Sequence, residues 1–229
     1  ASFGLLGNQN TTNWYQTYQT MSVGSSNGAW LMSGNKPNTA SAPGLVSASL
    51  TWETIESYNL GLDWGVFNNR LTGSFDWYIR DTKNMVGNAP ELPALLGTGV
   101  PITNNTDLRT SGWELSIGWN DRLNNGFTYG AKFNVSDART KITRYPNNPT
   151  KAVSTYIEGR YTNEVWGYTT VGLAKTDEEM QAHLATMPNG GQSALGSDWK
   201  AGDIMYADIN GDGKISGGSG TLNDTGDWT

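Results

Sequence analysis

The most constraining feature of this sequence is a strict period-two alternation of apolar and polar residues in four stretches that form two pairs. The stretches cover residues 58–64 and 71–80, and then 113–120 and 127–136. Because successive side chains of a β-strand point to opposite faces, each stretch predicts a strand with one apolar, aromatic face and one polar face. The apolar faces consist of Tyr58, Leu60, Leu62, Trp64, Leu71, Gly73, Phe75, Trp77, Ile79, Trp113, Leu115, Ile117, Trp119, Phe127, Tyr129, Ala131, Phe133 and Val135.

The connections between the strands indicate where the two faces lie. Within each pair the connection is short and polar, at residues 66–70 and 121–126, whereas the connections between and after the pairs are long. Short turns on one side and long loops on the other are typical of a transmembrane β-barrel, whose apolar face meets lipid and whose polar face lines a wet lumen. A soluble sandwich also uses amphipathic strands, but its core face is usually rich in Val, Ile and Leu. Here Trp and Tyr are frequent, which suits an aromatic girdle at a membrane interface.

Composition excludes several classes of function. The 229 residues include no Cys, which excludes disulfides and thiolate metal sites, and a single His, which excludes catalytic triads and multi-His zinc sites. A net charge of −6 argues against nucleic-acid binding. No spacing singles out a catalytic carboxylate pair and no nucleophile motif appears, so we expect no enzyme. No apolar run approaches the roughly 20 residues of a membrane helix.

The pattern predicts strands at about 54–65, 71–80, 112–120 and 127–139. A loop is expected from 81 to about 110. Residues 1–7 and about 14–24 are predicted to form a further strand pair or a strand and a loop. Residues 25–53 read as a loop rich in Ser, Asn, Gly and Pro, with an apolar segment at 29–32.

One short helix is predicted in the last third of the chain. Thr176 and Glu179 form a capping box, in which each side chain satisfies a backbone amide of the other. The helix is expected to run to Ala185 or Met187 and to end before Pro188. His183 lies on it and is expected to be packed or solvated rather than a ligand.

The most specific chemical signal is an EF-hand-like half loop near the end of the chain. Asp208, Asn210 and Asp212 offer oxygen atoms at alternate positions, and the Lys214 carbonyl can add a fourth. Hard oxygen ligands favour Ca²⁺ over Zn²⁺. The sequence therefore predicts a structural calcium site, although the same residues also suit a turn without an ion.

The predicted ligand shell is incomplete within the motif. Its twelfth position is Ser219 rather than the bidentate Glu of a full EF-hand loop. We expect Asp224 or Asp227 to return and close the shell. Gly213 permits the sharp turn, and Ile215 is expected to anchor the loop by packing.

The two ends of the sequence suggest a piece of a longer chain. It starts directly in a strand and turn pattern, without a leader, and stops in a polar loop. The predicted strands are also too few to close a barrel, and an open sheet edge is not tolerated in lipid. We therefore expect residues 1–229 to be a portion of a barrel domain, with residues 140–229 as a long extracellular loop region.

Several short motifs, in order and spanning nearly the whole chain, resemble the SusC/RagA family of TonB-dependent outer-membrane transporters of Bacteroidetes. Each motif is weak alone and the set is specific. The motifs lie at residues 7–9, 50–53, 59–63, 69–71, 76–78, 80–83, 92–93 with Gly97, 110–115, 156–159, 164–168, 202–204 and 208–213.

The resemblance implies a 22-stranded antiparallel transmembrane barrel with an N-terminal plug, of which this chain is a middle-to-late portion. It implies uptake of oligosaccharides or peptides across the bacterial outer membrane, powered by TonB through the missing N-terminal part. It also implies a SusD-like surface lipoprotein as partner. The loops at about 81–110 and 140–229 would face outward, and the polar strand faces would line the lumen or contact the plug. These polar faces include Asn59, Asp63, Asp76, Arg80, Glu114, Lys132 and Asn134.

Two other interpretations of this sequence remain open. One is a soluble, calcium-stabilised β-sandwich that binds glycans through exposed Trp. The other is a passive outer-membrane pore, because nothing in this segment itself couples to an energy source.

Overall fold

The computed structural model describes residues 1–9, 17–25, 31–91, 93, 95 and 98–229. The chain divides into two compact units, Ala1–Asn147 and Asn148–Thr229, each with its own architecture. Among the described residues, no helix has both the length and the apolar character that crossing a membrane requires.

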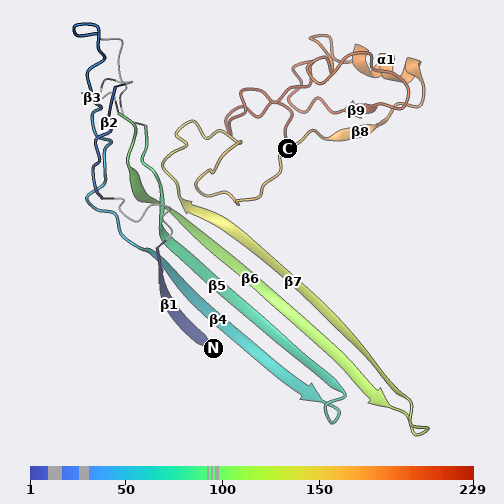
Figure 1. Ribbon diagram of the computed structural model, residues 1–229. Coiled ribbons are helices and arrows are strands. Elements are labelled where there is room, and N and C mark those ends of the chain that lie inside the picture. The colour runs from blue at the N-terminus through green and yellow to red at the C-terminus, as the bar shows by residue number, and fades with distance from the viewer. Residues whose placement is uncertain (10–16, 26–30, 92, 94, 96–97) are drawn as a thin grey trace. The chain divides into compact units, whose positions relative to one another are not determined.

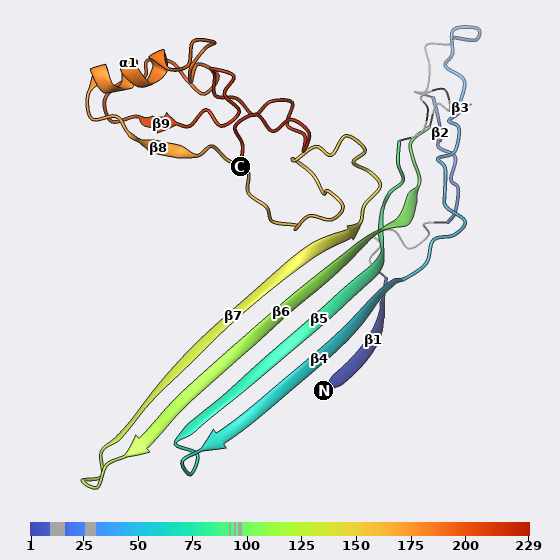
Figure 2. The same ribbon diagram turned by 180° about the vertical axis from the view of Figure 1, so that it is seen from behind.

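The first unit is built on a five-stranded antiparallel sheet with the strand order β1-β4-β5-β6-β7. Figure 1 shows the four long strands side by side, with the β4–β5 and β6–β7 turns at the same end; Figure 2 shows the same arrangement from behind. The strands are β1 (Ser2–Asn8), β4 (Glu53–Val66), β5 (Leu71–Asn88), β6 (Ile102–Arg122) and β7 (Thr128–Arg144).

Strand register puts the predicted apolar residues in one phase, except Phe127, which precedes the first residue of β7. Leu62 lies opposite Phe75, which lies opposite Leu115, which lies opposite Val135. One residue along, polar residues face each other in the same way. The predicted two-faced sheet is therefore confirmed, because a slip of one residue in any strand would mix the faces.

The apolar face of this sheet is largely exposed and is not buried as the core of its own unit. Leu62 and Phe133 keep 63% and 61% of their surface exposed. Of the buried hydrophobic side chains in the described part of the chain, only Ile142 belongs to this unit. A sandwich would instead bury this face under a second sheet.

The two tight turns fit their residues. Phe67, Asn68 and Asn69 have φ values of 53°, 54° and 62°, and Asn tolerates this left-handed region better than most side chains. In the other turn Gly126 has φ 89°, a value suited to glycine. Its amide donates to the Leu123 carbonyl at 2.9 Å.

The strands extend further toward the long loops than the sequence pattern predicted. The predicted loop at 81–110 is wrong, because β5 continues to Asn88 and β6 begins at Ile102. Polar pairs replace the apolar face in this extension. Arg109 donates to both carboxylate oxygens of Asp81 at 2.6 and 2.7 Å, and Arg144 does the same to Asp107 at 2.8 and 2.9 Å.

Of the two alternatives predicted for the N-terminal residues, the structure has the strand and the loop. β1 is a strand that pairs with β4, and residues 17–22 form no strand, whereas 14–16 lie outside the described residues. The two-residue strands β2 (Val23–Gly24) and β3 (Thr39–Ala40) pair with each other. Of the predicted apolar segment 29–32, only Leu31 and Met32 are described.

The second unit has little regular structure and a small core. It contains the paired strands β8 (Thr170–Leu173) and β9 (Ile204–Tyr206) and the helix α1 (Asp177–Ala185). The predicted helix start is confirmed, because Thr176 Oγ1 accepts from the Glu179 amide at 3.2 Å. The second half of the capping box differs: Glu179 Oε2 accepts from the Lys175 amide at 2.7 Å rather than from that of Thr176. Met180, Ala174 and Met205 form the core of this unit.

A cation in the middle of the apolar face tests its predicted contact with lipid. In the full-length protein, Phe75→Arg is expected to destabilise the protein in bilayers. Its free energy of unfolding should fall by about 2–4 kcal/mol, because a charge at the bilayer midplane is poorly solvated. Phe75→Leu is the apolar control. Denaturant unfolding in lipid vesicles measures both, and equal stability of the two variants would contradict a lipid-facing sheet.

Candidate functional site

The first candidate site is the polar face of the sheet. Register brings Asp76 directly opposite Glu114, while Asp63 and Asn134 lie in the neighbouring row. Near the tight turns this face is formed by small residues, and a polar depression of about 600 Å³ lies there beside Lys132. Such a surface can hydrogen-bond a polar solute or another protein segment without a deep cleft. All seven polar residues predicted to share this face have the same phase in the ladder.

The second candidate site is the loop after β9. Asp208 accepts two backbone amides of its own loop, from Gly211 at 2.7 Å and from Gly213 at 2.8 Å. Asp212 Oδ1 accepts the Lys214 amide at 3.1 Å. Gly211 and Gly213 have φ values of 75° and 80°, which let the chain turn back around Asp208.

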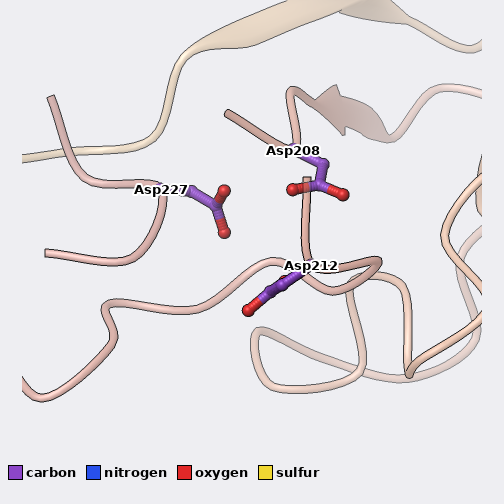
Figure 3. A group of neighbouring side chains, drawn as sticks. All are labelled: Asp208, Asp212 and Asp227. Carbon is purple, nitrogen blue, oxygen red and sulfur yellow. The ribbon is translucent and has the colours of Figure 1, made fainter. Parts of the chain in front are cut away.

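Asp227 joins this loop from the end of the chain. It is fully buried, and its carboxylate accepts the amides of Ile209 at 2.8 Å, Asn210 at 3.3 Å and Ser216 at 2.9 Å. Figure 3 shows its carboxylate directed toward that of Asp208, with Asp212 below the two. One oxygen from each of these three aspartates lies within 4.8 Å of the others. Asp227 therefore ties both ends of the loop to one side chain.

The other predicted ligands lie around this cluster in different roles. Asn210 Oδ1 accepts the Asp212 amide at 2.9 Å. Asp224 instead accepts the Ser219 amide at 2.8 Å and the Gly226 amide at 3.3 Å, within its own turn. The hydrogen bonds from Ser219 hold the pKa of the Asp224 carboxyl below its ordinary value.

A buried glutamine and the predicted anchor residue hold the loop in place. Ile215 is fully buried, and its amide donates to the Gly191 carbonyl at 2.7 Å. Gln192, also fully buried, donates to the Ile204 carbonyl at 3.0 Å and accepts the Tyr206 amide at 2.7 Å. His183 Nε2 lies 3.2 Å from the same Gln192 oxygen. The histidine is therefore a hydrogen-bonded structural residue in this unit.

Comparison with protein families gives one match over almost the whole chain. Residues 6–228 match the model described as "TonB dependent receptor-like, beta-barrel". TonB-dependent receptor P3 of Formosa agariphila is 28% identical over 94% of this chain and 21% of its own length. TonB-dependent receptor SusC of Bacteroides thetaiotaomicron is 28% identical over 62% of this chain and 14% of its own length. The chain thus spans about a fifth or less of these relatives.

Solved structures with a similar fold are those of RagAB. The RagAB peptide importer in its open-open state matches 76% of this chain and 18% of the compared chain, with a TM-score of 0.58 and 24% identity. Its closed-closed state matches 90% and 22%, with a TM-score of 0.55 and 22% identity. At this identity the likeness shows the fold alone.

Removing the Asp227 carboxylate tests its role in ordering the loop. Asp227→Ala leaves the amides of Ile209, Asn210 and Ser216 without their acceptor, and burial prevents full compensation by water. We expect their protection from hydrogen exchange to fall at least tenfold. Asp224→Ala, which removes the neighbouring exposed acceptor, is the control. Unchanged protection at Ile209 and Ser216 in Asp227→Ala would contradict this role.

Proposed function

Because the chain belongs to the TonB dependent receptor-like β-barrel family, we propose that it forms wall and loops of an outer-membrane transporter whose uptake depends on TonB. The family and the strand ladder confirm the predicted fold class, an all-β portion of a large barrel. The sheet of five strands does not close on itself. The remaining strands, the plug and the TonB contact belong in this proposal to the rest of a longer protein.

The proposed substrates are oligosaccharides or peptides. The structural neighbour RagAB is described as a peptide importer, which supports the peptide part of this proposal. In this chain the polar face contributes carboxylates and amides, Asp63, Asp76, Glu114 and Asn134, among small residues. Such a lining accepts hydrogen bonds from a polar solute without strong, specific retention, which suits passage rather than catalysis. The relatives are receptors and transporters, and we propose no enzymatic activity.

The proposed partner is a SusD-like surface lipoprotein that contacts the second unit. Exposed apolar side chains support this contact, because a small unit with a small core gains from covering them. Val165, Val171 and Leu173 expose 90%, 62% and 60% of their surface. The observation that carries the whole proposal is the family match from residue 6 to residue 228.

Uptake and partner binding can be tested together in the full-length transporter. Cells with functional TonB are expected to accumulate labelled peptide or oligosaccharide, and cells without it are not. Accumulation that is equal in both would support a passive pore instead.

Val165→Asp with Leu173→Asp is expected to reduce co-purification of the lipoprotein at least fivefold, because a charge replaces apolar contact. Leu123→Asp, in the tight turn between β6 and β7, is the control and should leave co-purification unchanged.

We also propose that Asp208, Asp212 and Asp227 hold a structural Ca²⁺. The donor set fits: it is all oxygen, and an amide hydrogen bond leaves a carboxylate oxygen with a further lone pair for a cation. Bound calcium would offset the repulsion among three close carboxylates and pin a loop that has little core.

Calcium addition to the chelator-treated full-length protein tests this proposal. We expect Ca²⁺ to slow proteolysis of residues 208–227 and Mg²⁺ to have less effect, because Mg²⁺ demands a stricter octahedral geometry. Asp212→Asn should weaken the response to calcium, since it removes one charge and keeps the shape. A cleavage rate that is the same with and without calcium would show that the motif is only a turn.

A further inference from the structure

A band of charged side chains continues the apolar face of the sheet toward the long loops. One row of the ladder contains Glu56 on β4, Asp81 on β5, Arg109 on β6 and Lys141 on β7. These residues have the same phase as Tyr58, Trp77, Trp113 and Val135. The band therefore lies on the lipid-facing side, above the end of the apolar stretch.

Most charges in this band are already neutralised by close pairs. Lys83 Nζ lies 2.7 Å from Glu56 Oε2, Arg109 holds both oxygens of Asp81, and Arg144 holds both oxygens of Asp107. Each of these carboxylates is thus matched to one cation of the same band.

Two cations on β7 lack such a partner. Lys141 forms no ion pair with any carboxylate in the described ranges. Arg139 has only a 3.4 Å contact with Asp137 on its own strand, and the two side chains are 67% and 53% exposed. Such an exposed pair contributes little and can open at little cost.

The position of Lys141 adds an unfavourable contact that an anion would relieve. It lies directly opposite Arg109, and Arg139 lies one diagonal step away. Like charges directly opposite on neighbouring strands destabilise a sheet. Arg139 and Lys141 are two residues apart on one face, so their Cα atoms are about 7 Å apart along the strand. This spacing lets both side chains reach one phosphate.

The depth of this pair fits the headgroup region of a bilayer. Arg139 follows Val135, the last apolar residue of its face on β7, by four residues. In a strand tilted by about 45°, four residues advance about 10 Å along the membrane normal. Long Arg and Lys side chains bend back toward the headgroups from such positions.

We propose that Arg139 and Lys141 bind the phosphate of an anionic lipid in the leaflet nearest the long loops. The apolar face below would hold the acyl chains of the same molecule, so charge and apolar contact recognise one ligand. The inference goes beyond transport and depends only on the lipid-facing orientation of the sheet. It holds or fails independently of substrate and of TonB.

The test uses the full-length protein in neutral detergent with phosphatidylglycerol and lipid A as phosphate-bearing probes. Native mass spectrometry measures how many lipids are retained and their affinity. Each cation near an anionic headgroup contributes about a fivefold gain in affinity, so Arg139→Gln with Lys141→Gln is expected to weaken one site about 25-fold. Lys132→Gln is the control, because Lys132 lies on β7 on the opposite face.

Two further arms make the outcome decisive. Inorganic phosphate at millimolar concentration should not displace the lipid, since it lacks acyl chains. Displacement would indicate a free-anion site and overturn the assignment. An unchanged affinity in the double variant would also overturn it, as would an equal loss in Lys132→Gln. A lowered melting temperature with unchanged lipid retention would show that a carboxylate elsewhere in the barrel pairs with these cations.

Discussion

The constraint on which the rest of this structure depends is the hydrogen bonding of the strand backbone. In the hydrocarbon of a bilayer an unpaired amide or carbonyl costs several kcal/mol, so strands can cross only when each pairs along its full length. The β4–β5 and β5–β6 ladders meet this condition with continuous registers through the apolar stretch. Once backbone groups are paired, the side chains decide which face meets lipid. The period-two alternation makes that choice the same for all four long strands.

Away from the apolar stretch the same ladder is held by charge. Toward the long loops, Asp81–Arg109 and Asp107–Arg144 bridge neighbouring strands where no apolar face remains. A bulge at Asn84 interrupts the register there, and the backbone amide of Asn84 donates to Asp107 Oδ1 at 2.7 Å. Polar pairs of this kind suit a zone in contact with headgroups and water, and they let the wall continue into the region of the loops. The proposed lipid site arises in this zone because its cations outnumber their available partners.

The sequence predicted the parts of the fold that follow from local pattern. The strands with alternating apolar residues, the tight turns and the capped helix each depend on residues close together in the chain. The extension of β5 and β6 was missed because its stability comes from pairs such as Asp81 and Arg109, which are 28 residues apart and have no periodic signature. In the loop site, Asp208, Asn210 and Asp212 could be read from spacing. The choice between Asp224 and Asp227 could not, because it depends on how a glycine-rich segment returns to the loop. Gln192 was missed for the same reason: nothing in its neighbourhood signals that it is buried against β9.

The most direct test of this account is the lipid accessibility of single residues along β5 in the full-length transporter. The sequence contains no native Cys, so spin labels can be attached at introduced cysteines from position 74 to 79 without interference from this region. Power-saturation measurements then compare collision with oxygen, which concentrates in lipid, and with a water-soluble nickel chelate. The account predicts high oxygen collision at positions 75, 77 and 79 and a higher ratio of nickel collision at 74, 76 and 78. Accessibility that does not alternate, or low collision with both reagents at the odd positions, would contradict a lipid-facing barrel wall.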